Sequence, residues 1–150
     1  MSMQMQFILP EIDRKETRES VESLLGKYRM YLLQTSLDRL PSITAAYTLV
    51  LNTGGLPGSS TESSAIANVD YESERKRFIE WIAGAVNRLP RDERSIIVQR
   101  YLQDDEMFDY QTYGELNMSE RNYFRLKSRA FYKLAFALKV EVYKEEVAVQ

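Results

Sequence analysis

Two arginines and an asparagine lie close together in the last third of the chain, at positions Arg121, Asn122 and Arg125. A guanidinium group can donate two parallel hydrogen bonds to O6 and N7 of guanine, and a carboxamide can pair with adenine in the same groove. These residue types therefore predict contacts with the base edges of double-stranded DNA, although a solvated helix face is the commoner role of arginine. Neighbouring residues with a hydroxyl or a positive charge are predicted to contact phosphates, which positions the protein without specifying a sequence: Ser119, Lys127, Ser128, Arg129 and Lys133.

The segment that carries these side chains has the periodicity of one long helix, predicted over residues 119–143. Ser119 is suited to the N-cap because its hydroxyl can accept from a backbone N–H two or three residues later, and Glu120 complements the helix dipole. At about 100° per residue, the apolar side chains share an arc that we expect to be buried: Tyr123, Leu126, Ala130, Leu134 and Ala137. The polar side chains lie opposite, with Arg129 at their edge: Arg121, Arg125, Ser128, Tyr132 and Lys139.

A short amphipathic helix is predicted just before this one, over residues 109–116. The two are separated by Asn117 and Met118, and asparagine tolerates the left-handed backbone that such a turn requires. A short helix, a tight turn and a capped basic helix form the outline of a helix-turn-helix, in which the first two turns of the second helix lie nearest the bases.

The aromatic residues of the same region admit two interpretations. Exposed rings could stack on bases, as they do in proteins that bind single strands. Helical spacing instead favours core packing for Tyr123 and Phe131, while Tyr132 lies on the outer face and stays open. Trp81, in an earlier segment, is predicted to anchor the core.

Composition excludes several classes of function. The chain has 150 residues without cysteine or histidine, which removes disulfides, thiolate metal sites and the commonest general base. The acidic run at residues 104–106 could suggest a metal or acid–base site, but a solvated turn is the expected interpretation. No pairing of a nucleophile with a base is found, so we expect neither an enzyme nor a cofactor. With no signal-peptide pattern and no long apolar run, a cytoplasmic location is expected.

The net charge of −2 argues against DNA binding until it is divided along the chain. Residues 119–139 hold six basic side chains and one acidic side chain, whereas residues 89–118 hold three basic and seven acidic ones. Positive charge is therefore concentrated on the segment proposed to meet DNA.

The remaining segments predict an all-α fold. A helix is predicted over residues 14–35, with Asp13 and Glu16 as a capping box; it could pack on the later helices or pair with its own copy. Residues 43–51 are apolar and β-branched, which is compatible with a strand or an extended docking segment. Two further helices are predicted over residues 71–88, capped by Asp70, and from Pro90 in the first turn to about residue 102.

The buried face of the helix over residues 71–88 is predicted from its apolar spacing: Phe78, Trp81, Ile82, Ala85, Val86 and Leu89. The domain organisation that follows is a helical arm with a docking segment over residues 1–51, a Gly/Pro/Ser-rich linker over 52–68, and a four-helix DNA-binding domain over 69–150. Residues 1–10 have no clear period and are expected to form a loose arm.

One order of features resembles region four of bacterial sigma factors: Leu89-Pro90, then Ile96-Ile97, then Arg100-Tyr101, then the helix-turn-helix. The resemblance implies a helix that leads into a promoter-reading helix-turn-helix and a contact with RNA polymerase. Asn117 stands where that family usually has glycine. No segment resembles the promoter-melting region of a complete sigma factor.

A second resemblance covers nearly the whole chain, through these segments: FILPEIDRKETRESV, KYRMYLL, LPSIT, STESSAIANVDYE, NRLPRDERSIIVQRYL and YGELNMSERNYFRLKSRAFYKLAFALKVEVYKEE. They are similar to the ArpU family of phage and prophage transcriptional regulators. Membership would imply a regulator of late phage genes for packaging or lysis.

Two other classes of function stay open at this point. A small terminase subunit would grip phage DNA with a helix-turn-helix and assemble into a ring through its other helices. A sigma-like adaptor would bind RNA polymerase without free DNA. The expected partner is double-stranded DNA, with RNA polymerase and, through the N-terminal helix, a second copy of the chain as further candidates. No contact with a membrane is expected.

Overall fold

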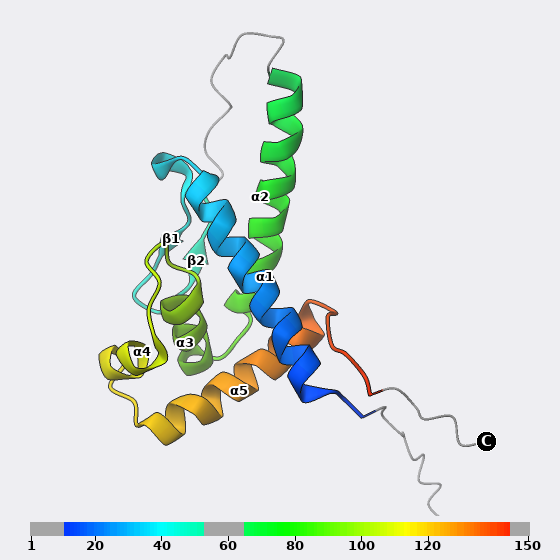
Figure 1. The fold of residues 1–150 in the computed structure, drawn as a ribbon. Coiled ribbons are helices and arrows are strands. Elements are labelled where there is room, and N and C mark those ends of the chain that lie inside the picture. Colours follow the sequence, from blue (N-terminus) through cyan, green and yellow to red (C-terminus); the bar gives the residue numbers. More distant parts are fainter. Residues whose placement is uncertain (1–10, 53–64, 145–150) are drawn as a thin grey trace, which may run out of the picture.

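The computed structural model describes residues 11–52 and 65–144, with side chains from residue 70 onward in the second range. The described part is mostly helical, which confirms the predicted fold class (Figure 1). Its elements are α1 (Arg14–Gln34), a 3-10 turn η1 (Leu37–Arg39), β1 (Ser42–Ile43), β2 (Leu49–Val50), α2 (Ala65–Asn87), α3 (Arg91–Tyr101), α4 (Asp109–Glu115) and α5 (Glu120–Ala137). The loose arm predicted at residues 1–10, and residues 53–64 of the predicted linker, lie outside the described residues.

Helix α1 begins where the sequence predicts. Asp13 is its N-cap, and the Asp13 carboxylate accepts a hydrogen bond from the Glu16 backbone N–H at 3.0 Å. The expected capping box is not completed, because the backbone N–H of Asp13 donates to the carbonyl of Val142 at 2.8 Å instead. The apolar spacing of the helix buries one stripe of side chains: Thr17, Val21, Leu25, Tyr28 and Leu32.

This stripe packs against α2, α3 and α5. In Figure 1, α1 crosses α2 and the end of α5. All four helices contribute to one hydrophobic cluster, so the expectation that α1 packs on the later helices is confirmed. The fully buried members include Val21, Ile82, Val86, Ile97 and Leu134.

Two predictions for α2 are wrong. The helix begins at Ala65, so Asp70 lies inside it and is not its cap. Trp81 is 43% exposed, and it packs edge-on against Phe78, with ring centroids 5.8 Å apart. The reason is the direction in which the buried face of α2 points. The buried residues Ile79, Ile82, Ala83 and Val86 repeat at three and four positions and define one face of the helix; Trp81 lies beside that face.

The apolar segment at residues 43–51 forms a short antiparallel hairpin, in which Ser42 pairs with Val50 and Ile43 with Leu49. Tyr47 makes the turn with a φ of 61°. The Asn87 side chain accepts from the Leu49 backbone N–H at 2.8 Å and donates to its carbonyl at 2.9 Å, as a neighbouring strand would. The hairpin is thereby held to the end of α2.

Pro90 is the N-cap of α3, one position before the first turn in which the sequence placed it. Asp92 and Glu93 lie in the first turn, where their charges favour the positive end of the helix dipole. The predicted end of this helix, about residue 102, agrees with the observed end at Tyr101.

Helix α5 ends at Ala137, six residues before the predicted end. Lys139 takes a left-handed backbone with a φ of 59°. The Val140 backbone N–H then donates to Ala135 at 2.9 Å, and that of Lys139 to Phe136 at 3.2 Å, which is a Schellman motif. Ala137, predicted to be buried, is exposed because the apolar arc turns toward Ala135 and Leu138 at this end.

The chain after α5 returns to the beginning of α1, so the first and last described segments lie side by side (Figure 1). The Lys144 backbone N–H donates to Glu11 at 2.8 Å. The Thr17 hydroxyl donates to the Val142 carbonyl at 3.2 Å and accepts from its N–H at 3.0 Å. These bonds hold the beginning of α1 against the segment that follows α5.

Leu134→Ala tests the packing of α5 against this core. Leu134 is fully buried, so its truncation leaves a cavity, and we expect the free energy of unfolding to fall by about 2–5 kcal/mol. Leu33→Ala is the matched control, because the same substitution at a leucine that is 64% exposed should change stability by about 0.5 kcal/mol or less. Chemical denaturation measures both; equal effects would contradict the burial.

Candidate nucleic-acid interface

Helices α4 and α5 form the predicted helix-turn-helix, and Asn117 has the predicted left-handed conformation, with a φ of 55°. The Met118 backbone N–H donates to Tyr113 at 2.9 Å and that of Asn117 to Gly114 at 3.3 Å, a second Schellman motif. The unit has its own small cluster, in which Ile96, Tyr123 and Leu126 are buried against Tyr113, Leu116 and Met118.

The beginning of α5 also agrees with the sequence. The Ser119 hydroxyl caps the helix by accepting from the Asn122 backbone N–H at 3.2 Å. Four predicted site residues then point to solvent on the outer face: Arg121, Arg125, Ser128 and Arg129. Arg121 and Arg129 make no hydrogen bond or ion pair with the described parts of the chain. We call these four residues the basic stripe.

Asn122 is half-buried at the edge of the basic stripe. Its side-chain oxygen accepts a hydrogen bond from Nη2 of Arg125 at 2.7 Å. Two of the three side chains predicted to read bases are therefore coupled to each other, one helical turn apart.

Lys127 is not part of the exposed stripe. Its side chain is 14% exposed, and its ammonium lies 2.9 Å from the Asp109 carboxylate. The same ammonium lies over the rings of Tyr101, Phe124 and Phe131, at 5.4–5.8 Å from their centroids. This environment is that of a structural cation, which disfavours the predicted phosphate contact.

Lys133 is also paired, but it keeps access to solvent. Its ammonium lies 2.8 Å from the Glu93 carboxylate, and the two side chains are 48% and 5% exposed. A buried carboxylate needs a partner, and Lys133 is the partner of Glu93. Its predicted contact with phosphate remains a prediction.

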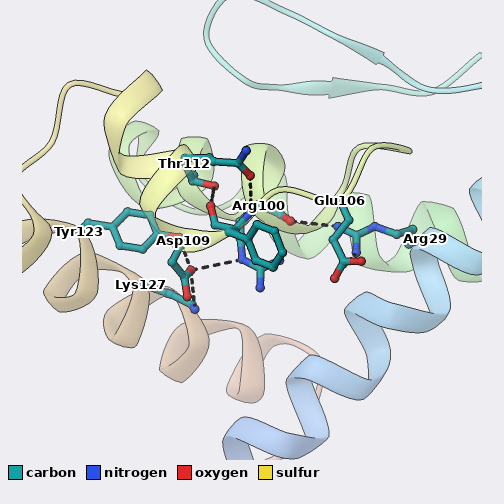
Figure 2. Close-up of polar contacts among 9 residues, drawn as sticks. Arg29, Arg100, Glu106, Asp109, Thr112, Tyr123 and Lys127 are labelled. Atoms are coloured by element: carbon teal, nitrogen blue, oxygen red, sulfur yellow. Dashed lines mark hydrogen bonds and ion pairs between the residues drawn. The ribbon is translucent and has the colours of Figure 1, made fainter.

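Asp109, the first residue of α4, joins three elements through one carboxylate oxygen (Figure 2). This oxygen accepts from the Tyr123 hydroxyl at 2.6 Å, from Lys127 at 2.9 Å and from Nε of Arg100 at 3.3 Å. Tyr123 and Lys127 belong to α5, whereas Arg100 belongs to α3. We call these four residues the Asp109 network.

The network changes the proton affinity of its members. Burial by itself would raise the pKa of the Asp109 carboxyl, but the hydrogen bonds from Tyr123 and Lys127 and the charges of Lys127 and Arg100 outweigh it and lower that pKa below its ordinary value of 3.8. Burial and the bond to Asp109 raise the pKa of Tyr123, which keeps its hydroxyl protonated as a donor.

The acidic turn before α4 is tied to α1. Nε of Arg29 donates to the Gln103 carbonyl at 3.2 Å, and its Nη2 donates to the Arg100 carbonyl at 3.0 Å, which satisfies carbonyls at the end of α3. The third nitrogen lies 3.7 Å from the exposed carboxylate of Glu106 (Figure 2). Within residues 11–52 and 65–144, no group of three or more acidic side chains could hold a metal ion.

The aromatic residues divide as their spacing indicates. Tyr123 and Phe131 are buried, so core packing is confirmed for both. Tyr132 is 56% exposed and packs edge-on against Phe136, with centroids 4.9 Å apart. The described helices include none that is both long and apolar enough to cross a membrane.

The sequence alone did not predict the role of Asp109, and it indicated Arg100 only as part of the resemblance to sigma region four. A signal was present: a carboxylate in the first turn of the first helix, with cations in the helices before and after it. That signal gains meaning only when folding brings the three helices together.

Asp109→Asn tests the network. The variant keeps the shape but loses the charge that faces Arg100 and Lys127, so we expect the free energy of unfolding at neutral pH to fall by about 1–3 kcal/mol. Because the folded pKa of Asp109 is lowered, its contribution is complete above the ordinary value of 3.8 and is lost as pH falls below it. The stability difference between wild type and variant should therefore shrink in acid.

Unfolding curves across the acid range measure this difference. Glu106→Gln is the control, since its partner Arg29 is 3.7 Å away and its own side chain is 69% exposed, and its effect should be small at every pH. A constant difference between wild type and Asp109→Asn down to strong acid would contradict the lowered pKa.

Comparison with known proteins gives one informative relative. No model of a known protein family matches the chain, and no solved structure matches it. The chain is 30% identical over 139 residues to the uncharacterized phage-related protein Lin1259/Lin1739 of Listeria innocua, an alignment that covers 92% of this chain and 97% of the relative. This protein therefore belongs to the family of that phage-related protein.

Proposed function

We propose that this protein is a sequence-specific, double-stranded DNA-binding transcriptional regulator encoded by a phage or prophage. The observation that carries the proposal is the basic stripe. It occupies the outer face of the first turns of α5, in a helix-turn-helix whose turn and cap are formed by Asn117 and Ser119. In helix-turn-helix proteins this is the part of the second helix that reaches base edges.

The roles within the stripe follow from the contacts of each side chain. Arg121 and Arg125 are exposed in the first two turns and are assigned to base edges in the major groove. Ser119, Ser128 and Arg129 flank them and are assigned to phosphates, with Lys133 at the far end of the set. Lys127 is assigned to the Asp109 network, because its ammonium is already bound there.

The biological context comes from similarity. The relative from Listeria innocua is described as phage-related, which supports a phage or prophage origin. The resemblance to the ArpU family supports regulation of late genes for packaging or lysis. The resemblance to sigma region four supports a further contact with RNA polymerase. The expectations that the protein is no enzyme and acts in the cytoplasm are part of the same proposal.

Arg121→Ala and Arg125→Ala test the base contacts. Each change removes a guanidinium fork, so we expect it to weaken binding to the preferred duplex by about 1–3 kcal/mol and to relax specificity at one base pair. The duplex is obtained by selection from random fragments and by footprinting across the gene neighbourhood. Fluorescence anisotropy then measures affinity. If neither change alters affinity or specificity, the proposed reading face is wrong.

Arg129→Ala tests the phosphate contacts. Its loss should weaken binding about equally on all sequences and reduce the slope of log affinity against log salt by about 0.9. Lys127→Ala is the comparison variant. It removes the ion pair with Asp109, so it should lower the melting temperature of the protein. A salt slope unchanged by Arg129→Ala would remove that residue from the interface.

A further inference from the structure

The hydrogen bond between Asn122 and Arg125 distinguishes two arginines that the sequence treats alike. Nη2 of Arg125 donates to Oδ1 of Asn122 at 2.7 Å, one helical turn away. Arg121 has no such partner within the described residues. The guanidinium of Arg125 is thus oriented before any ligand arrives, whereas that of Arg121 is not.

Asn122 is itself held in place. Its backbone N–H donates to the Ser119 hydroxyl at 3.2 Å, so it belongs to the capped first turn of α5, and its side chain is half-buried. The chain of contacts runs from the cap through Asn122 to Arg125. The orientation of Arg125 is therefore coupled to the capped first turn of α5.

The geometry of a guanidinium group leaves Arg125 able to read a base. Nη2 carries two hydrogens, one beside Nε and one beside Nη1, and Asn122 occupies one of them. Whichever is used, one edge of the group keeps two parallel donors. Two parallel donors match O6 and N7 of guanine. In contrast, Asn122 would need its own Oδ1 to pair with adenine, and Arg125 already uses one of the two lone pairs of this oxygen.

We propose that Asn122 is a positioning residue, which holds Arg125 in the orientation that reads a guanine, and that Asn122 does not itself read adenine. This inference rests on the proposed function. A side chain that is already oriented loses less rotational freedom on binding, so loss of Asn122 should weaken recognition of that guanine by about 2- to 10-fold.

The test uses the full-length protein and its selected duplex. Each guanine is replaced in turn by 7-deazaguanine, which lacks the N7 acceptor, and affinity is measured by anisotropy. The guanine whose replacement costs nothing further in Arg125→Ala is the one that Arg125 reads. At this guanine, Asn122→Ala should reduce the ratio of affinities for guanine and 7-deazaguanine by about 2- to 10-fold. In the Arg125→Ala background it should change nothing more.

Two controls separate positioning from loss of structure. Asn122→Asp keeps an acceptor for Arg125, so it should preserve the ratio even though its negative charge weakens overall affinity. Ser128→Ala removes a proposed phosphate contact from the same exposed face, so it should weaken binding to the guanine and 7-deazaguanine duplexes equally and leave their ratio unchanged. All variants should melt near the wild-type temperature, because the Ser119 cap uses the backbone of residue 122 and not its side chain.

The outcomes are distinct. Loss of discrimination at an adenine in Asn122→Ala, independent of Arg125, would overturn the inference and make Asn122 a base reader. An unchanged guanine ratio would also overturn it, while leaving DNA binding intact. If wild type selects no duplex at all, the proposed function fails, and this inference fails with it.

Discussion

One carboxylate determines how the helix-turn-helix is held. Asp109 brings α4 to α5 through Tyr123 and Lys127, and to α3 through Arg100. Removing these charges from water is costly, and the cost is offset because three donors converge on the same oxygen. The relative placement of α4 and α5 therefore depends on directional bonds as well as on the small cluster around Ile96 and Leu126.

Tyr123 links the two kinds of stabilisation. Its ring is fully buried against Tyr113, with centroids 5.5 Å apart, and its hydroxyl ends at Asp109. Beside the Asp109 network, Arg29 connects α1 to the carbonyls at the end of α3 (Figure 2). The N-terminal helix thus supports the element that carries Arg100, and the inner face of α5 is fully engaged. Its outer face is exposed to solvent.

The features that depend only on neighbouring residues in the sequence were predicted. The cap at Ser119, the left-handed Asn117 and the beginning of α1 each follow from one or two side chains and their own backbone. The end of α5 was not predicted because it depends on the left-handed backbone of Lys139. Lysine has no strong preference for that conformation, so the sequence carries no signal for the end of the helix there. The exposure of Trp81 was missed because burial depends on which face the neighbouring helices cover. The sequence placed Arg121, Arg125, Ser128 and Arg129 on one exposed face, but the ion pairs of Lys127 and Lys133 depend on tertiary contacts.

Those ion pairs change the electrostatic argument. The sequence concentrates six basic residues against one acidic residue in residues 119–139, which suggests a strongly positive ridge. In the folded chain, Lys127 is matched by Asp109 and Lys133 by Glu93, both of which come from the acidic stretch before the turn. The charge on the exposed face of the first three turns of α5 is then largely that of Arg121, Arg125 and Arg129. A guanidinium fork is better suited to directional contact with base edges than to diffuse attraction, so under the proposed function this face should favour discrimination between sequences over non-specific affinity.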